Sequence, residues 1–184
     1  MNKAFFCKPM ESKEFTARII SLSDMDVLQK VGKETFYDSF IDITPPDDMK
    51  AYLNSSFSSD VLQTELEDEQ SKYYFLELGD VVVGYGKINF DKAPYGMMEI
   101  PHSMEIQRIY IKKEFQRMGA ARKLMHVFFD EAKRRKCNSI WLSTGSFNNH
   151  ALSFYKKYGF EKIGNHEFPV GGKIFEDVIL LLKR

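Results

Sequence analysis

The segment 116–122, with the sequence QRMGAAR, combines small and basic residues in a way that suits anion binding. Gly119 and the two alanines after it leave the backbone open to close approach, because no bulky side chain stands in the way. Arg117 and Arg122 flank this turn and supply positive charge. If a helix begins here, its first amide groups lack intrahelical partners and its dipole adds partial positive charge. The segment therefore predicts a cradle for an anion such as a pyrophosphate.

The same residues also have a purely structural interpretation, because a Gly-Ala start is common in helices that pack closely on a neighbour. The segment differs from the nucleoside triphosphate P-loop, which ends in Gly-Lys-Ser/Thr. It also differs from the full G-x-G-x-x-G of a dinucleotide-binding fold. Taken alone, the segment leaves both interpretations open.

The residues on either side predict a strand before the segment and a helix after it. β-Branched and aromatic side chains favour a strand over 105–111, because they suit a half-buried pleated surface. After the segment, apolar residues recur at helical spacing and give one face that can pack on a sheet. These residues are Ala121, Leu124, Met125, Phe128 and Ala132. A strand–loop–helix unit from Met104 to Arg135 would thus hold the anion-binding segment.

The rest of the chain alternates between strand-like and helix-like segments. Before this unit we predict a strand, a helix, a pair of short helices rich in acidic residues, and a hairpin, at residues 15–21, 23–40, 42–69 and 72–89. Gly84 and Gly86 lie in the second strand of that hairpin and predict a bulge or a close approach. After the unit we predict a strand, a helix and a final hairpin, at residues 139–144, 148–160 and 161–183. This order predicts an α/β fold with a mixed sheet.

Length and charge limit the possible functions. A chain of 184 residues is most simply one domain, predicted at 15–184, after an extension over 1–14 for which disorder is one interpretation. Twenty-six basic and 26 acidic residues cancel, which argues against general nucleic-acid binding or binding to an anionic membrane. Cys7 and Cys137 are too few for a disulfide framework or a metal site. No segment reads as a signal peptide or a membrane span, so we expect a cytoplasmic protein.

Two motifs occur in a characteristic order: Gln116-x-x-Gly119-x-Ala121, then Asn148-x-x-Ala151-x-x-x-Tyr155-x-x-x-Gly159-Phe160. Together they resemble the GNAT superfamily of acetyl-CoA-dependent N-acetyltransferases, and the order of elements agrees from about Thr16 to the end. A closer resemblance is to bacterial spermidine/spermine N-acetyltransferases of the Pai type. The resemblance implies a mixed, mostly antiparallel sheet of six to seven strands with helices on both faces.

The resemblance also implies a site for acetyl-CoA, with no metal. The pantetheine arm would pair with the end of the strand 105–111, the pyrophosphate would lie on the loop amides, and an asparagine would touch the arm. The implied residues are Ile109, Tyr110, Ile111, Gln116, Arg117, Met118, Gly119, Ala120, Ala121, Arg122, Asn148 and Lys157. A solvated surface lysine is an equally good interpretation of Lys157.

The chemistry of acetyl transfer assigns roles to the remaining polar residues. An amine with a pKa of about 10.4 is mostly protonated near pH 7, so a neutral amine costs roughly 4 kcal/mol and needs a base. Related polyamine enzymes tend to have an acid where this chain has Gln107, which cannot act as a base. Glu105, on the same strand face by alternation, is the candidate base, and a structural strand carboxylate is an equally good interpretation of it. The resemblance implies that Tyr155 protonates the departing thiolate, and Glu34, Asp38 and Gln107 would hold a cationic amine.

We therefore expect transfer of an acetyl group to a small cationic amine, with polyamines favoured. A protein N-terminus, an amino acid or an aminoglycoside is an alternative acceptor, and a non-catalytic acyl-CoA-binding module is an alternative function. The sequence is compatible with a monomer and with a homodimer.

Overall fold

A seven-stranded sheet runs through the computed structural model, which describes residues 14–184 except 93, 95–99 and 171. The strand order is β1-β2-β3-β4-β5-β7-β6. The strands are β1 (Phe15–Ile19), β2 (Ser71–Leu78), β3 (Val81–Phe90), β4 (Ser103–Ile111), β5 (Ser139–Gly145), β6 (Glu161–Val170) and β7 (Lys173–Lys183). The β4–β5 pair is parallel, and the other neighbours are antiparallel. The predicted mixed, mostly antiparallel sheet is therefore confirmed, whereas the predicted N-terminal extension lies outside the described residues apart from Glu14.

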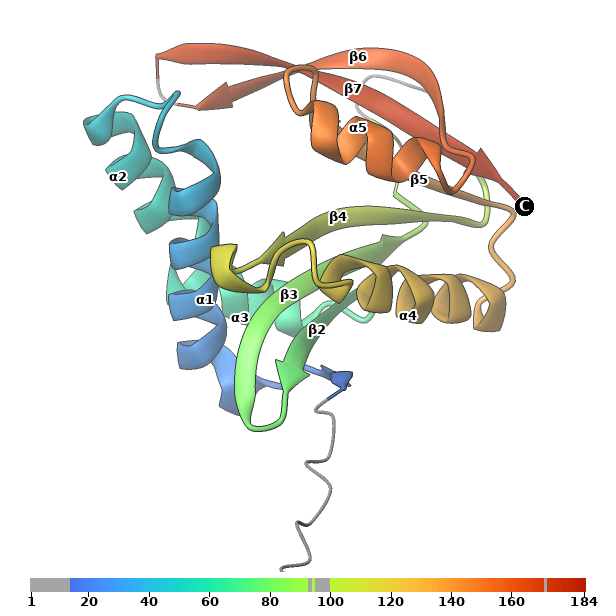
Figure 1. Ribbon diagram of the computed structural model, residues 1–184, viewed down its shortest axis with the longest axis horizontal. Coiled ribbons are helices and arrows are strands. Elements are labelled where there is room, and N and C mark those ends of the chain that lie inside the picture. Colours follow the sequence, from blue (N-terminus) through green and yellow to red (C-terminus); the bar gives the residue numbers. More distant parts are fainter. Residues whose placement is uncertain (1–13, 93, 95–99, 171) are drawn as a thin grey trace, which may run out of the picture.

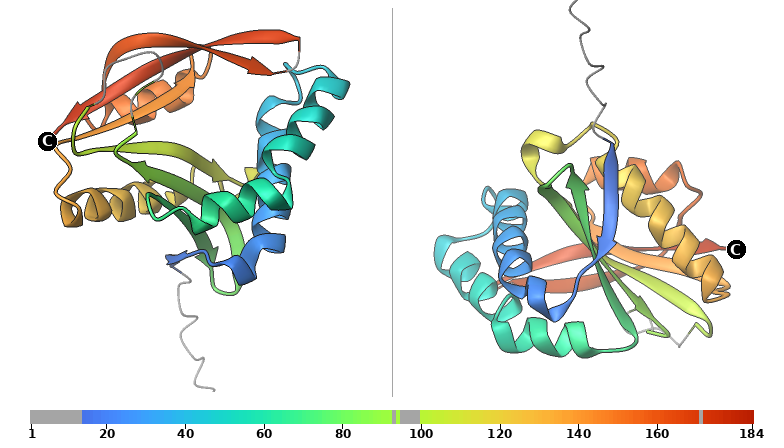
Figure 2. Two further views of the ribbon diagram at one scale, coloured as in Figure 1. Left: turned by 180° about the vertical axis from the view of Figure 1, so that it is seen from behind. Right: turned by 90° about the horizontal axis from the view of Figure 1, so that it is seen from below.

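Helices cover both faces of the sheet, as Figures 1 and 2 show. They are α1 (Met25–Phe40), α2 (Pro46–Ser56), α3 (Ser59–Glu67), α4 (Ala120–Arg134) and α5 (Asn149–Lys156), with short 3-10 turns η1 (Leu22–Asp24) and η2 (Lys113–Phe115). Within the described part of the chain, no helix combines the length and the apolar character needed to cross a membrane.

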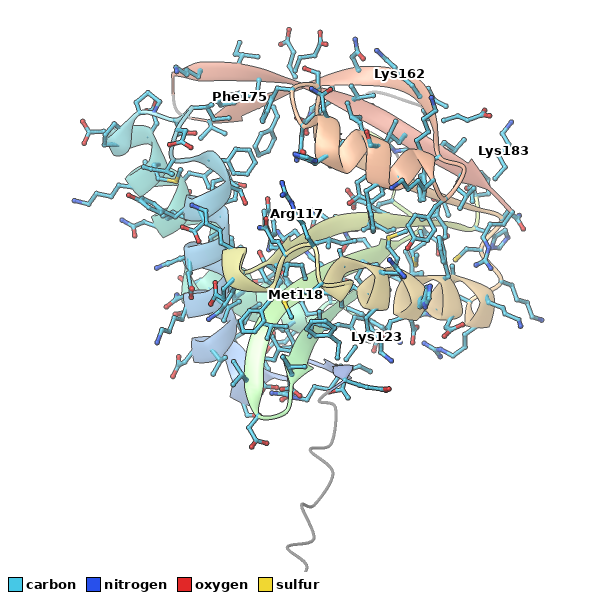
Figure 3. The ribbon with its side chains drawn as sticks, viewed as in Figure 1. Arg117, Met118, Lys123, Lys162, Phe175 and Lys183 are labelled. Carbon is cyan, nitrogen blue, oxygen red and sulfur yellow. The ribbon has the colours of Figure 1, made fainter. Side chains whose placement is uncertain are left out.

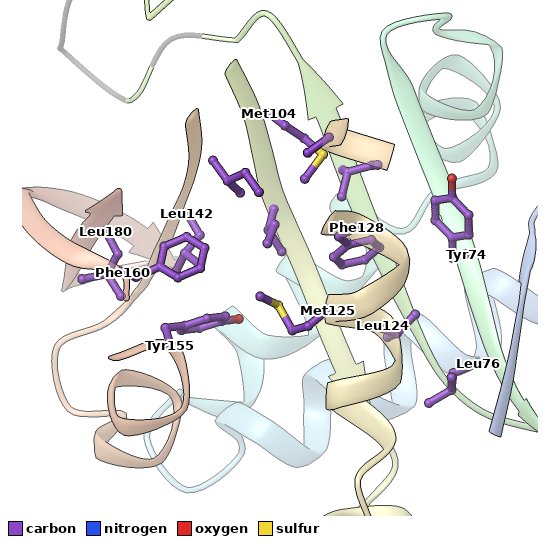
Figure 4. Packing of buried hydrophobic residues seen from close by; sticks show 14 of the residues in the cluster. Tyr74, Leu76, Met104, Leu124, Met125, Phe128, Leu142, Tyr155, Phe160 and Leu180 are labelled. Atoms are coloured by element: carbon purple, nitrogen blue, oxygen red, sulfur yellow. The ribbon is translucent and has the colours of Figure 1, made fainter. Parts of the chain in front are cut away.

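The sheet separates two hydrophobic cores. On one face, Leu28 of α1 and Leu62 of α3 pack with Tyr73 and Tyr85 of the sheet. On the other face, the apolar side of α4 packs against β2 to β5 and against α5, as Figure 4 shows in detail. The predicted apolar face of α4 packs on the sheet, with Leu124, Met125, Phe128 and Ala132 buried and with Ala120 in place of Ala121 at its start.

The ends of the helices follow local hydrogen-bonding rules. Ser58 Oγ accepts from the backbone amide of Val61 at the start of α3, and Asn148 Oδ1 accepts from the amide of Ala151 at the start of α5. Two predicted starts differ slightly. Helix α1 begins at Met25, after a 3-10 turn that Ser21 caps, and α2 begins at Pro46, because proline suits the first turn of a helix.

Gly84 and Gly86 mark close contacts in the middle of the fold, as predicted. A Cβ atom on Gly84 would lie 2.4 Å from the backbone oxygen of Tyr110 in β4, and one on Gly86 would lie 2.4 Å from the Phe128 ring of α4. Strand β3 therefore lies against β4 and α4 at distances that admit no side chain at these two positions.

We predict that Gly84→Ala destabilises the protein by about 1–3 kcal/mol, because the contact is with backbone that cannot rotate away. Urea unfolding followed by circular dichroism measures the change. Gly172→Ala is the matched control, since the nearest atom to its Cβ is 4.0 Å away. Equal unfolding midpoints for the two variants would contradict the close contact between β3 and β4.

Candidate active site

Strands β4 and β5 pair at their first residues and then separate. In the described structure their register covers Ser103 with Ser139, Met104 with Ile140, and Glu105 with Trp141. From Ile106 onward, β4 keeps its hydrogen-bonded neighbour β3, but its other edge has no strand beside it. Backbone amides and carbonyls on this edge are therefore available to an extended ligand. Figure 1 shows the two strands diverging.

A β-bulge accompanies the separation. Opposite β3, Ile106 pairs with Ile88 and Arg108 pairs with Lys87, so Gln107 is an extra residue. A bulge bends its strand and increases the local twist, which turns the second half of β4 away from β5. The predicted alternation that placed Glu105 and Gln107 on one face is interrupted here, because Arg108 takes the next paired position after Ile106.

The separation opens a cavity of about 340 Å³ between the two strands. Several predicted site residues from distant parts of the chain meet in its lining. They are Glu105, Gln107, Ile109, Tyr110, Ile111, Gln116, Asn148 and Tyr155. We refer to this cavity as the cleft.

Tyr155 projects from α5 into the region between β5 and α4. Figure 4 shows its side chain directed toward Met125. The residue is only 9% exposed, and its ring contacts the rings of Phe154 and Phe160. Burial raises the pKa of Tyr155 above its ordinary value. The phenol therefore keeps its proton near neutral pH and can act as a proton donor.

Glu105 is a buried carboxyl group at the point where the strands separate. It is 5% exposed, and Asn89 Nδ2 donates a hydrogen bond to its Oε2 at 2.5 Å. Burial raises the pKa of Glu105 and outweighs the opposite effect of the Asn89 hydrogen bond. A carboxylate with a raised pKa is a better proton acceptor at neutral pH than a solvated one.

Gln107 has an unsatisfied polar atom. Its Oε1 is buried and, among the described residues, has no hydrogen-bond partner. Buried polar atoms are normally paired in proteins, so an orphaned acceptor lining a cavity suits a donor from a ligand.

The loop before α4 contains two residues with left-handed backbone, and the helix after it begins without a side-chain cap. Arg117 and Gly119 adopt left-handed φ angles of 63° and 88°, and Gln116 Nε2 donates to the Ile111 carbonyl at 3.0 Å. Gly119 gives α4 no side-chain cap, and the first turn of the helix contains no acidic residue. A Cβ on Gly119 would meet no atom within 4 Å, so the backbone there is open. In Figure 3, Arg117 points upward from this loop toward α5.

Glu34, Asp38 and Lys157 lie outside the lining of the cleft, as do the predicted loop residues 117–122. Glu34 and Asp38 of α1 instead form ion pairs with Lys112 Nζ at 3.2 Å and Lys113 Nζ at 3.7 Å. Lys157 is exposed just after α5. These ion pairs link α1 to the residues that follow β4.

An ionic network packs behind the cleft. Glu65 accepts from Lys87 Nζ at 2.7 Å and from Arg108 at 3.3 Å, and Tyr73 bridges Glu65 and Arg108. Burial disfavours the charged form of Glu65, but its two cations outweigh that effect and lower its pKa. Burial lowers the pKa of Lys87 to about 8. The network joins α3 to three strands and fixes Arg108 next to the bulge.

The sequence reasoning missed the part of the cleft formed by β5, β6 and β7. Asp177, His166 and Ser143 line it, and Ser143 Oγ donates to Asp177 Oδ2 at 2.9 Å. The available signal was an acidic residue, Asp177, in the predicted last strand just before an apolar run.

Comparisons with known proteins agree with this geometry. Residues 34–160 match the sequence profile of the acetyltransferase (GNAT) family. An uncharacterised N-acetyltransferase from Lactobacillus delbrueckii subsp. lactis is 29% identical over 165 residues, which cover 89% of this chain and 95% of that protein.

Two solved structures share the fold. The PaiA N-acetyltransferase from Thermoplasma acidophilum, in complex with coenzyme A, has a TM-score of 0.75 and 18% identity, over 93% of this chain and 99% of that one. The ribosomal-protein-S18-alanine N-acetyltransferase from Escherichia coli has a TM-score of 0.68 and 14% identity, over 92% and 94%. The family profile spans most of the chain and includes the loop before α4 and Tyr155. The chain therefore belongs to the acetyltransferase (GNAT) family and is an acetyl-CoA-dependent N-acetyltransferase.

Proposed function

We propose that this enzyme moves the acetyl group directly to a primary amine of a small cationic acceptor, with polyamines as the favoured class. The observation that carries the proposal is the meeting of a proton donor and a proton acceptor, Tyr155 and Glu105, in one cleft beside the free edge of β4. Direct transfer needs these two groups and no covalent enzyme intermediate.

The residues around the cleft fit acetyl-CoA, which supplies the thioester as acyl donor. The unpaired edge of β4 at 109–111 can hydrogen-bond the pantetheine arm in the manner of a neighbouring strand. The open backbone of Arg117–Arg122 suits the pyrophosphate, because successive amides in left-handed turns form an anion-binding concavity. Asn148 Oδ1 already caps α5, which leaves its amide nitrogen for the arm.

Glu105 and Tyr155 would each transfer protons during the reaction. Glu105 accepts a proton from the incoming ammonium group, directly or through water, so that the amine can form the new N–C bond. A backbone amide of β4 near Ile109 donates to the carbonyl oxygen as that oxygen gains charge. Tyr155 donates its proton to sulfur as the C–S bond breaks. The nitrogen loses a second proton once the N–C bond has formed, and this proton restores Tyr155 through solvent, while Glu105 releases the first proton to solvent.

A thiol-release assay with acetyl-CoA and a panel of amines tests the proposed acceptor class. We expect di- and polyamines to accelerate release of coenzyme A more than amino acids, aminoglycosides or a peptide N-terminus do. Faster release with a peptide or an amino acid than with any polyamine would contradict the acceptor class. If no amine accelerates release, direct transfer to a small amine is wrong.

We predict that Tyr155→Phe lowers the single-turnover rate of acetyl transfer by about 100-fold, since general acid catalysis contributes on that order. Binding of coenzyme A, measured by calorimetry, should change little because the ring remains. Tyr158→Phe removes a hydroxyl three residues away and is the matched control. An unchanged single-turnover rate for Tyr155→Phe would exclude this tyrosine as the acid.

We predict that Glu105→Gln lowers kcat/KM by about 100-fold and removes the acidic limb of the pH profile. The base works when deprotonated, so wild-type activity should rise with pH through the raised pKa of Glu105. Glu167→Gln, at an exposed position of β6, should leave the profile unchanged. An unaltered profile for Glu105→Gln would show that another group accepts the proton.

A further inference from the structure

Asp177 is a carboxylate inside the cleft that proton transfer, as described above, does not use. It lies in β7, where the register places it beside Gly145 of β5 and His166 of β6. Ser143 Oγ donates to its Oδ2 at 2.9 Å, and this hydrogen bond fixes the orientation of the carboxylate. In the described structure, no lysine or arginine lies within ion-pair distance of Asp177.

Arg108 and His166 border this part of the cleft. Arg108 also lines the cleft, but it is held by Glu65 and Tyr73. His166 faces Asp177 across the β6–β7 register and favours its charged form, yet burial has the larger effect and raises the pKa of Asp177. A cationic ligand bound next to Asp177 would stabilise the charged form of this carboxylate.

Aromatic side chains form the walls around this carboxylate. Tyr52 of α2 stacks on Phe36 of α1 with ring centroids 4.3 Å apart and meets Phe168 of β6 edge-on at 6.1 Å. Phe147 and Phe175 form a second pair at 6.2 Å, and Figure 3 places Phe175 on the hairpin above the opening. All five residues line the cleft.

A carboxylate among aromatic faces recognises a particular kind of ligand. The carboxylate pairs with an ammonium group, the ring faces attract the same positive charge, and the ring surfaces also accommodate methylene groups. An uncharged or anionic group would leave the half-buried carboxylate without an opposite charge. The chemistry therefore matches an alkylammonium.

We propose that Asp177, oriented by Ser143, is a specificity-determining residue that binds a second ammonium group of the acceptor while the reacting amine lies near Glu105. The enzyme therefore selects α,ω-diamines and longer polyamines over monoamines. This inference rests on the proposed transfer to a small cationic amine. It identifies the residue that binds the charged group distant from the reacting nitrogen.

The test compares Asp177→Asn with wild type on α,ω-diamines and monoamines of matched chain length. For the best diamine, we expect kcat/KM to fall about 10- to 100-fold, mostly through KM, because the charge pair with the second ammonium group is lost. For the monoamine we expect kcat/KM to change by less than about threefold, which corresponds to the small energy of an exposed ion pair. Glu176→Gln is the matched control, since this neighbour on β7 is exposed and lies outside the cleft.

Two results would overturn the proposal. An equal loss for diamine and monoamine would mean that Asp177 acts on the reacting amine or on the fold, and an unchanged diamine reaction would mean that no such subsite exists. If Asp177→Asn does not fold, Ser143→Ala takes its place, with a severalfold loss of diamine preference expected and an unchanged preference contradicting the proposal.

A binding measurement separates this inference from the proposed function. Calorimetric titration of the same diamine into wild type with coenzyme A should show binding that Asp177→Asn weakens at least about tenfold. Binding without thiol release would retain the subsite and remove the proposed reaction. Thiol release from diamines with equal affinity in both proteins would retain the reaction and remove the subsite.

Discussion

The site depends on a loss of pairing between two neighbouring strands. Hydrogen bonding along a sheet normally leaves no backbone groups free in its interior, yet β4 has one edge without a partner over its second half. The extra residue at Gln107 makes this possible, because it bends β4 while its pairing with β3 continues. The cleft, the free backbone edge and the approach from the loop before α4 all follow from that one irregularity.

A bent strand in the middle of a sheet has to be held, and two features hold it. On one face, Gly84 and Gly86 let β3 lie against the backbone of β4 and the ring of Phe128. On the other face, Arg108 is anchored by Glu65 and Tyr73 next to the bulge. Buried ion pairs often contribute little net stability, but leaving one partner alone is costly. The network therefore selects one geometry for β4 more than it strengthens the fold.

Periodicity and turn chemistry predicted most of the architecture. Helical spacing from Ala121 to Ala132 and the cap at Asn148 are local signals, and the fold keeps them. The bulge had no such signal, since a glutamine inside a strand looks like any other polar residue. A strand without the bulge alternates strictly, and this pattern placed Glu105 and Gln107 on one face. Glu34 and Asp38 form ion pairs with Lys112 and Lys113, contacts that are set by tertiary structure and that the helical pattern does not reveal. Asp177 was missed because its cavity is built from elements far apart in the chain.

The hairpin of β6 and β7 lies at the end of the sheet and joins the other strands through β5 alone. Its inner positions, among them His166, Phe168, Phe175 and Asp177, line the cleft, while the loop before α4 and the edge of β4 belong to other elements. If the acceptor binds at this hairpin as proposed, substitutions at these positions change which amines fit while the loop and the strand edge stay as they are. Acceptor choice would then be physically separable from catalysis, and a lineage could exchange one substrate for another by altering a single peripheral hairpin.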